Sequence, residues 1–166
     1  MTVYADDAEK LKNKKLFIFI ALSGFAIDRL SKFLIRENFR IGEARAVIGN
    51  FFRLTHITNT GIAFGMARGN NIFFLILSLA IISLIIYFFV KKAAARELLP
   101  LALITAGAAG NIYDRIFYGS VCDFLEFNLG FPPFDPWPIF NIADAMVVTG
   151  GVILFYIEFI RKKPVK

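Results

Sequence analysis

The stretch "PIFNIADAMVVTGGVILFYIEFI", Pro138 to Ile160, has the composition of a membrane helix with a carboxylate near its start. Asp144 lies one turn into the apolar run, and Asn141 precedes it by three positions. An ionised group near the centre of a membrane helix costs around 2.5–3.5 kcal/mol on insertion scales. The local sequence leaves two interpretations open. Asp144 either meets the positive end of the helix dipole, or it belongs to a functional site with a partner elsewhere in the chain.

The composition of the whole chain favours a membrane protein. Hydrophobic residues make up 57% of the 166 residues and charged residues make up 19%, and the mean hydropathy is +0.63. These values are typical of a polytopic membrane protein rather than a soluble globular core. The net charge of +6 does not indicate nucleic-acid binding. The basic residues cluster at the ends of apolar segments, where they are better explained as topology signals.

Four apolar segments predict an all-α membrane protein with four transmembrane helices in a single domain, residues 1–166. The segments cover about residues 16–35, 72–90, 98–113 and 142–160. Each is near the roughly 20 residues that cross a hydrocarbon core of about 30 Å, the third being the shortest. We expect the first segment to be a retained helix rather than a cleaved signal peptide, because the chain continues with "DRLSK" and not with a small-residue cleavage site.

The distribution of basic residues predicts that both termini are cytoplasmic. Basic residues precede the first span, link the second to the third and follow the fourth, as the positive-inside rule requires. The segment 114–144 holds one basic residue against five acidic ones, so we expect it outside. The other outer segment, residues 36–71, departs from the rule because it carries Arg36, Arg40, Arg45, Arg53 and Arg68. Its β-branched and aromatic residues predict a small β-element on the membrane surface, over about residues 44–67.

Charged residues in or beside the spans are candidates for function. Asp28 and Lys32 are four apart, so they can pair on one helix face, and a structural pair is the simpler interpretation. The predicted topology puts Asp114, Asp123 and Asp144 near the outer surface. Two close carboxylates share a proton because both cannot ionise easily. Such a pair can hydrolyse a peptide bond by general acid–base catalysis, although spacing alone does not show that Asp123 and Asp144 meet.

The sequence contains few of the residues that other catalytic sites require. His56 is the only histidine and Cys122 the only cysteine, which disfavours a Ser–His–Asp site, a zinc site and a cysteine nucleophile with a base. We expect His56 to be a strand residue and Cys122 a small buried hydrophobe, with no metal or cofactor. Two other function classes remain open. One is a transporter or channel subunit that uses the carboxylates as a proton or cation relay, and the other is an assembly protein whose polar residues only hold helices together.

Five short blocks follow one another along the chain: "DRLSK" with Asp28 and Lys32, "NTGIAFG" with Asn59, Gly61, Ala63 and Phe64, "GNIYDR" with Gly110, Asn111, Asp114 and Arg115, "VCDF" with Asp123, and "FNIADA" with Asn141, Ala143 and Asp144. With these blocks in family order, the chain resembles the bacterial lipoprotein signal peptidases (signal peptidase II), which are membrane aspartic proteases with four transmembrane helices. The resemblance runs from Asp28 to the end of the fourth helix. The chain departs from the family at Arg29, where the family usually has Gln, and at Cys122, where it usually has an aliphatic residue.

The resemblance implies an aspartic endopeptidase of the bacterial cytoplasmic (inner) membrane, with Asp123 and Asp144 as its catalytic pair. It implies a prolipoprotein substrate whose lipobox cysteine carries a diacylglyceryl group, cleavage just before that cysteine, and inhibition by the cyclic peptide globomycin. We expect the enzyme to be monomeric and Asp114 to pair with a basic group. We also expect Asn111, Arg115 and Asn141 to hold the carboxylates or the substrate backbone, and Asn59 and Gly61 to shape the outer loop against the site.

Overall fold

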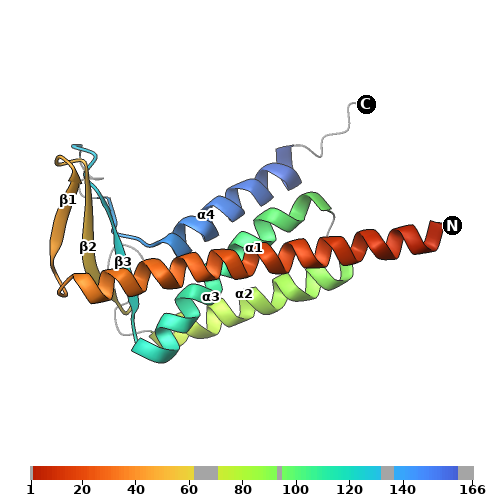
Figure 1. The fold of residues 1–166 in the computed structure, drawn as a ribbon, viewed down its shortest axis with the longest axis horizontal. Helices are drawn as coiled ribbons and strands as arrows, with labels where there is room; N and C mark the ends of the chain where they lie inside the picture. The colour runs from red at the N-terminus through yellow and green to blue at the C-terminus, as the bar shows by residue number, and fades with distance from the viewer. Residues whose placement is uncertain (1, 62–70, 93–94, 132–136, 161–166) are drawn as a thin grey trace.

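The computed structural model describes residues 2–61, 71–92, 95–131 and 137–160, which form a helical bundle with a small antiparallel sheet across one end (Figure 1). The main helices are α1 (Thr2–Asn38), α2 (Asn71–Lys92), α3 (Leu98–Tyr118) and α4 (Ile142–Phe155). A short 3-10 helix (η2, Ala95–Glu97) precedes α3, and a π-helical segment (η3, Tyr156–Ile160) continues α4. The start of α1 and the end of α4 lie at the end of the bundle opposite the sheet (Figure 1).

The four helices predicted from the sequence are present, with different bounds. The first begins near the start of the chain, and α3 continues to Tyr118, so Asp114 and Arg115 lie inside a helix and not beyond its end. Within the described residues, no helix combines the length and the apolar character that a membrane crossing requires.

Local sequence explains where α3 and α4 end and begin. The helix α3 ends at Gly119, which caps it in the left-handed conformation with φ of 70°, a geometry that glycine adopts without a side-chain penalty. The helix α4 begins with a capping box, in which Asn141 is the N-cap and Asp144 the third helical residue. Asp144 is therefore fixed at the first turn of α4. There it meets the positive end of the helix dipole, which is one of the two interpretations that the local sequence left open.

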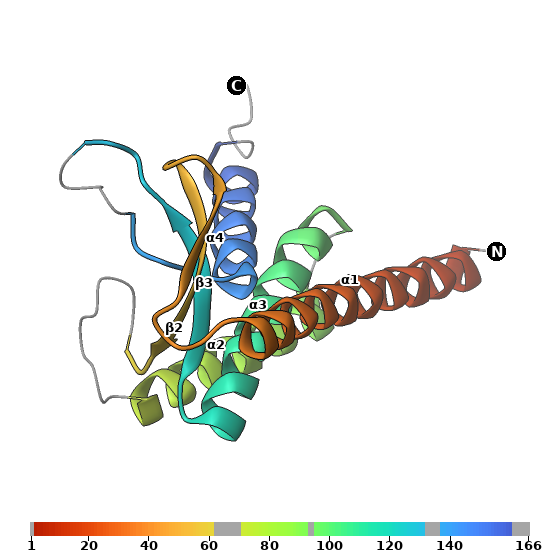
Figure 2. The same ribbon diagram turned by 60° about the vertical axis from the view of Figure 1, so that its left-hand side comes forward.

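The sheet has the order β1-β2-β3, with all neighbours antiparallel. The predicted β-element is present as β1 (Ala44–Ile48) and β2 (Phe52–Asn59), and part of its remainder lies outside the described residues. The third strand, β3 (Val121–Phe127), comes from the block that contains Asp123. Figure 2 shows the sheet at the same end of the bundle in a turned view.

The segment that leads into α4 is tied to β3 by backbone hydrogen bonds. Phe140 N donates to Leu125 O over 3.2 Å, and Leu125 N donates to Phe140 O over 2.8 Å. Because Asn141 follows at once and starts α4, these bonds hold the N-terminus of α4 beside β3. This pairing brings the "VCDF" and "FNIADA" blocks together.

Buried apolar residues form two clusters. One lies among the helices and includes Phe17, Ile85 and Leu101. The other lies where α1 meets the sheet, with Ile35, Cys122 and Phe124. Many large apolar side chains on α1, α2 and α4 are not covered by either cluster and remain exposed, among them Phe19, Leu22, Ile72, Ile76, Val148 and Val152.

Candidate active site

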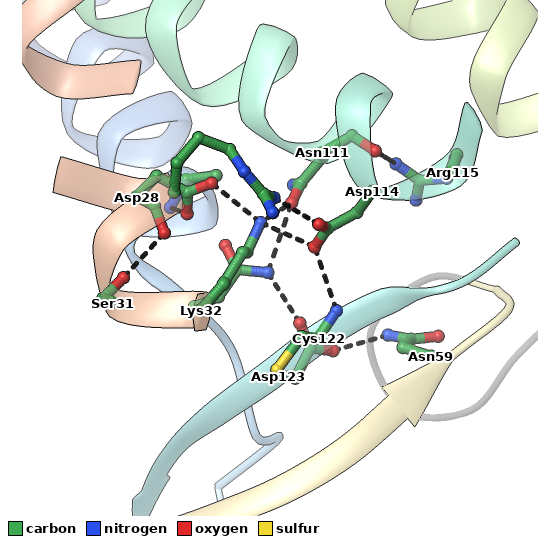
Figure 3. A network of polar contacts seen from close by, with 12 residues as sticks. Asp28, Ser31, Lys32, Asn59, Asn111, Asp114, Arg115, Cys122 and Asp123 are labelled. Atoms are coloured by element: carbon green, nitrogen blue, oxygen red, sulfur yellow. Dashed lines mark hydrogen bonds and ion pairs between the residues drawn. The ribbon is translucent and has the colours of Figure 1, made fainter. Parts of the chain in front are cut away.

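Asp123 lies in β3 with its carboxylate enclosed, and 3% of the residue is exposed. Asn59, at the end of β2, donates from Nδ2 to Asp123 Oδ2 over 2.8 Å (Figure 3). Asn141 donates from Nδ2 to Asp123 Oδ1 over 2.6 Å. The side chain of Asn59 is itself positioned, because Gly61 N donates to its Oδ1 over 2.9 Å. Both carboxylate oxygens of Asp123 are thus occupied by asparagine donors.

Asp144 is held by the cap of α4 and by α3. Its Oδ2 accepts a hydrogen bond from Asn141 N over 3.1 Å, and its own N–H donates to Asn141 Oδ1 over 2.9 Å. Its Oδ1 accepts from Asn111 Nδ2 over 2.7 Å. One residue therefore contacts both candidate catalytic carboxylates, since Asn141 uses its side-chain amide on Asp123 and its backbone on Asp144.

The two carboxylates line the same cavity, which has a volume of about 680 Å³. Its polar lining includes Asp123, Asp144, Asn59, Asn111 and Arg115. Its walls are mainly apolar and come from α2, α3, α4 and the segment before α4, including Leu77, Ile81, Ile104, Ala108, Phe140, Val147 and Val148. An apolar cavity with a few converging polar groups has the form of a substrate site.

Burial and the neighbouring carboxylate perturb Asp123. Desolvation is the larger cause and the charge of Asp144 the second, and together they raise the pKa of Asp123 to about 7, against the lowering effect of the two asparagine donors. A carboxyl group with such a pKa exists in both protonation states near neutral pH. It can therefore act as a proton donor or as a proton acceptor.

A buried charge cluster lies behind the asparagines. Lys32 Nζ is 2.9 Å from Asp28 Oδ2 and 3.2 Å from Asp114 Oδ2, and it donates to Asn111 Oδ1 over 2.9 Å (Figure 3). The predicted pair of Asp28 and Lys32 is thus formed. Because Lys32 occupies the oxygen of the Asn111 side chain, the amide nitrogen of Asn111 is directed to Asp144.

Asp114 joins this cluster to β3. One of its oxygens, Oδ2, accepts the backbone N–H of Cys122 over 3.1 Å, directly before Asp123. Its other oxygen, Oδ1, makes ion pairs with Arg29 and with Arg36, the latter over 2.9 Å. The expectation that Asp114 pairs with basic groups is confirmed. Sequence reasoning missed Arg36 as a partner, although the positions of Arg29, Lys32 and Arg36 at i, i+3 and i+7 already put them on one helix face.

Close backbone packing explains the small residues of the blocks. A Cβ on Gly110 would collide with the carboxylate of Asp28, and it would lie 3.4 Å from Ala143 Cβ. Ala143 is fully buried, and its N–H donates to Asp28 Oδ1 over 3.0 Å. The first turn of α4 therefore contacts α1 and α3 directly, which fixes the position of the neighbouring Asp144.

The other residues that the sequence singled out lie as follows. Arg115 lines the cavity, and its Nη1 donates to Asn111 O over 3.4 Å. His56 is a buried strand residue whose Nδ1 is 2.9 Å from Phe39 O. Cys122 is buried, and burial raises the pKa of its thiol to about 11. Ala63 and Phe64 lie outside the described residues. In the part of the chain that the structure describes, no group of three or more His, Cys, Asp or Glu residues is arranged to hold a metal ion.

Comparison with known proteins shows the family of the chain. A family model described as Signal peptidase (SPase) II matches residues 20–160. The lipoprotein signal peptidase of Moorella thermoacetica is 41% identical over 140 residues, which cover 83% of this chain and 89% of that protein. The lipoprotein signal peptidase of Syntrophus aciditrophicus is 35% identical over 162 residues, covering 92% and 98% of the two chains. A solved structure described as a bacterial membrane enzyme, obtained by the in meso method at 2.3 Å resolution, has a TM-score of 0.77 and 32% identity, covering 90% of this chain and 94% of that one. This chain therefore belongs to the signal peptidase II family.

Proposed function

We propose that the protein is an aspartic endopeptidase that removes the signal peptide from diacylglyceryl-modified prolipoproteins by cleaving before the lipobox cysteine. The observation that carries this proposal is that Asp123 and Asp144 line one mainly apolar cavity. Family membership supports the substrate class, since the named relatives are lipoprotein signal peptidases. The apolar walls suit a signal peptide and acyl chains.

In the proposed mechanism the two carboxylates share one proton and activate one water molecule. The ionised carboxylate takes a proton from the water as it attacks the scissile carbonyl carbon, and the protonated carboxyl donates to the carbonyl oxygen. The tetrahedral intermediate then collapses, the C–N bond breaks, and the leaving amine takes a proton from the pair. The two carboxylates titrate jointly, so the proton belongs to the pair and not to either residue.

The asparagines keep this pair in place. Four hydrogen bonds from Asn59, Asn111 and Asn141 occupy the four carboxylate oxygens. Neutral donors hold the carboxylates without adding a counter-charge, which would stabilise full ionisation of both. Arg115 also lines the cavity, and we assign to it the binding of the substrate backbone or of the developing oxyanion.

We further propose that the bundle is embedded in the bacterial inner membrane as a monomer, with both termini cytoplasmic and the sheet on the outer side. Large exposed apolar side chains on α1, α2 and α4 support this, because a soluble monomer rarely exposes so much apolar surface. Asp28 and Lys32 of α1 are fully buried and pair with each other inside the bundle. The cyclic peptide globomycin is expected to bind the cavity.

The test is cleavage of a diacylglyceryl-modified precursor by the Asp123→Asn and Asp144→Asn variants. Each change is expected to abolish cleavage while the protein still inserts and folds. Substantial turnover by either variant contradicts the catalytic pair. Loss of membrane accumulation without any catalytic effect favours an assembly protein, and cation or proton flux in liposomes that depends on either aspartate favours a transporter.

A further inference from the structure

Two arginines on α1 form a cationic site that the proposed mechanism does not use. Arg29 and Arg36 are seven residues apart on one helix face, and both pair with the same oxygen, Asp114 Oδ1. Their side chains are 17% and 18% exposed. Neither lines the cavity that holds Asp123 and Asp144. Arg29 is also one of the two positions at which the sequence departs from the signal peptidase II pattern.

The cluster around these arginines carries surplus positive charge. Three cationic side chains, Arg29, Lys32 and Arg36, face two carboxylates, Asp28 and Asp114. Lys32 is fully buried, so the uncompensated charge lies on the two partly exposed guanidinium groups. In addition, Arg36 Nη1 is buried and has no hydrogen-bond partner among the described residues. The cluster thus combines a surplus positive charge on two partly exposed side chains with one guanidinium donor that the protein itself does not satisfy.

Two tyrosines hold the guanidinium planes in fixed orientations. The guanidinium carbon of Arg29 lies 4.2 Å from the ring centroid of Tyr113, and that of Arg36 lies 3.9 Å from the centroid of Tyr118. A stacked guanidinium presents its N–H groups at its edge, and that edge matches two oxygens of a phosphate. Tyr118 is half exposed, so its ring is accessible beside the Arg36 guanidinium.

The surroundings of the site favour a lipid as the source of that phosphate. Phe33, Ile116 and Phe117 are exposed by 55%, 56% and 65%. Phe33 lies between the two arginines in α1, and the other two lie between the two tyrosines in α3. The site also lies toward the sheet end of both helices, which the membrane placement proposed above puts at the level of the outer headgroups. Arg36, one of the arginines by which this outer segment departs from the positive-inside rule, then has a lipid partner.

We propose that Arg29, Arg36 and Tyr118 bind the headgroup phosphate of an anionic phospholipid in the outer leaflet. This inference rests on the proposed membrane placement but not on the catalytic role of the aspartates. The two guanidinium edges take the phosphate oxygens, the tyrosine hydroxyl donates to one of them, and the acyl chains lie against the exposed apolar residues of α1 and α3.

The test measures which lipids the protein retains. Purified full-length protein in detergent is incubated with equal amounts of phosphatidylglycerol and phosphatidylcholine, and the bound lipids are counted by native mass spectrometry. The wild-type protein is expected to prefer phosphatidylglycerol. Arg29→Gln and Arg36→Gln should each reduce that preference roughly fivefold, as expected for one arginine at an anionic surface. The matched control is Arg45→Gln, because Arg45 is an exposed arginine paired with Glu43, and it should leave the preference unchanged.

Each alternative outcome has a definite consequence. An unchanged preference in Arg29→Gln, or an equal loss in Arg45→Gln, overturns the site. Displacement of phosphatidylglycerol by inorganic phosphate at the same concentration overturns the lipid as ligand, because the site then takes any phosphate. If either arginine variant fails to fold because Asp114 loses a partner, Tyr118→Leu decides the question. A reduced preference in Tyr118→Leu supports the site, and an unchanged one overturns it. Cleavage by the wild-type protein is assayed separately. A protein that retains phosphatidylglycerol but does not cleave refutes the peptidase and leaves this site standing.

Discussion

Replacing Asp123 by asparagine should change how the stability of the protein depends on pH. Burial and the charge of Asp144 raise the pKa of Asp123 in the folded protein to about 7, from an ordinary value of 3.8. The pair of Asp123 and Asp144 in the folded protein therefore binds a proton that the unfolded chain releases, over the range between these two values. The wild-type protein loses stability as the pH rises through that window, whereas the Asp123→Asn variant has no titrating group, and so no such dependence, at this position.

The expected magnitude follows from the size of that change. A rise in the pKa from 3.8 to about 7 corresponds to roughly 4 kcal/mol, at 1.36 kcal/mol per pH unit. The asparagine amide cannot accept both hydrogen bonds from Asn59 and Asn141, which costs about 1–3 kcal/mol. That cost is independent of pH and cancels when two pH values are compared. We compare the free energy of unfolding of the variant with that of the wild type. Relative to the wild type, the variant should be roughly 3–4 kcal/mol more stable at pH 8 than at pH 4.5.

The measurement is equilibrium unfolding by urea in a mild detergent at the two pH values, followed by the fluorescence of Trp137, the only tryptophan. The matched control is Glu43→Gln, which also turns a carboxylate into an amide. A backbone N–H from Arg40 lowers the pKa of Glu43, so the stability that its charge contributes is lost as the pH falls, and the control should show a small effect of the opposite sign. The reasoning is refuted if the difference between Asp123→Asn and wild type is the same at both pH values.

Three further changes test the site and its support. Asn59→Ala removes a donor to the Asp123 carboxylate, so the pKa of Asp123 should rise further and the alkaline limb of the pH profile of kcat/KM should move up by about one pH unit. A shift to lower pH contradicts this. Gly110→Ala should destabilise the protein by about 1–3 kcal/mol because its Cβ meets a buried carboxylate. Gly151→Ala, whose Cβ meets nothing within 4 Å, should be neutral or stabilising by up to about 1 kcal/mol, and chemical denaturation compares the two. Lys32→Met leaves two buried carboxylates without their shared ammonium and should lower the free energy of unfolding by about 3–5 kcal/mol. An unchanged denaturation midpoint would show that the ion pairs of Lys32 do not stabilise the protein.

The helices and much of the site's support could be predicted from the sequence because both depend on short-range patterns. Apolar runs of helix length located α2 and α4 to within a few residues. The spacing of Asp28 and Lys32 predicted their ion pair, which depends only on the geometry of one helix. Asp114 was also expected to pair with a basic group, and it pairs with Arg29 and Arg36.

The rest of the site depends on contacts between distant segments, which no local pattern encodes. The segment before α4 adds to β3 through Phe140 and Leu125, and that pairing decides which face of β3 meets the start of α4. The role of Arg36 was missed because it depends on α3 continuing past its predicted end and carrying Asp114 against α1. The position of Asn59 likewise depends on the register of β2 against β3.

Asn141 combines two functions that a single substitution can separate. As the N-cap of α4 it accepts a hydrogen bond from Asp144 N, and as a bridge it donates from Nδ2 to Asp123 Oδ1. Serine is as good an N-cap as asparagine, but its short hydroxyl cannot cap the helix and reach Asp123 together. Asn141→Ser should therefore keep the cap, lose about 1–3 kcal/mol of stability with the hydrogen bond to buried Asp123, and reduce kcat for precursor cleavage by roughly tenfold or more, as expected when a donor that positions a reacting group is lost. Asn141→Ala should show the same loss of kcat together with a larger loss of stability. If Asn141→Ser cleaves as fast as wild type, the bridge does not position the pair, and the capping box alone explains why asparagine stands before Asp144.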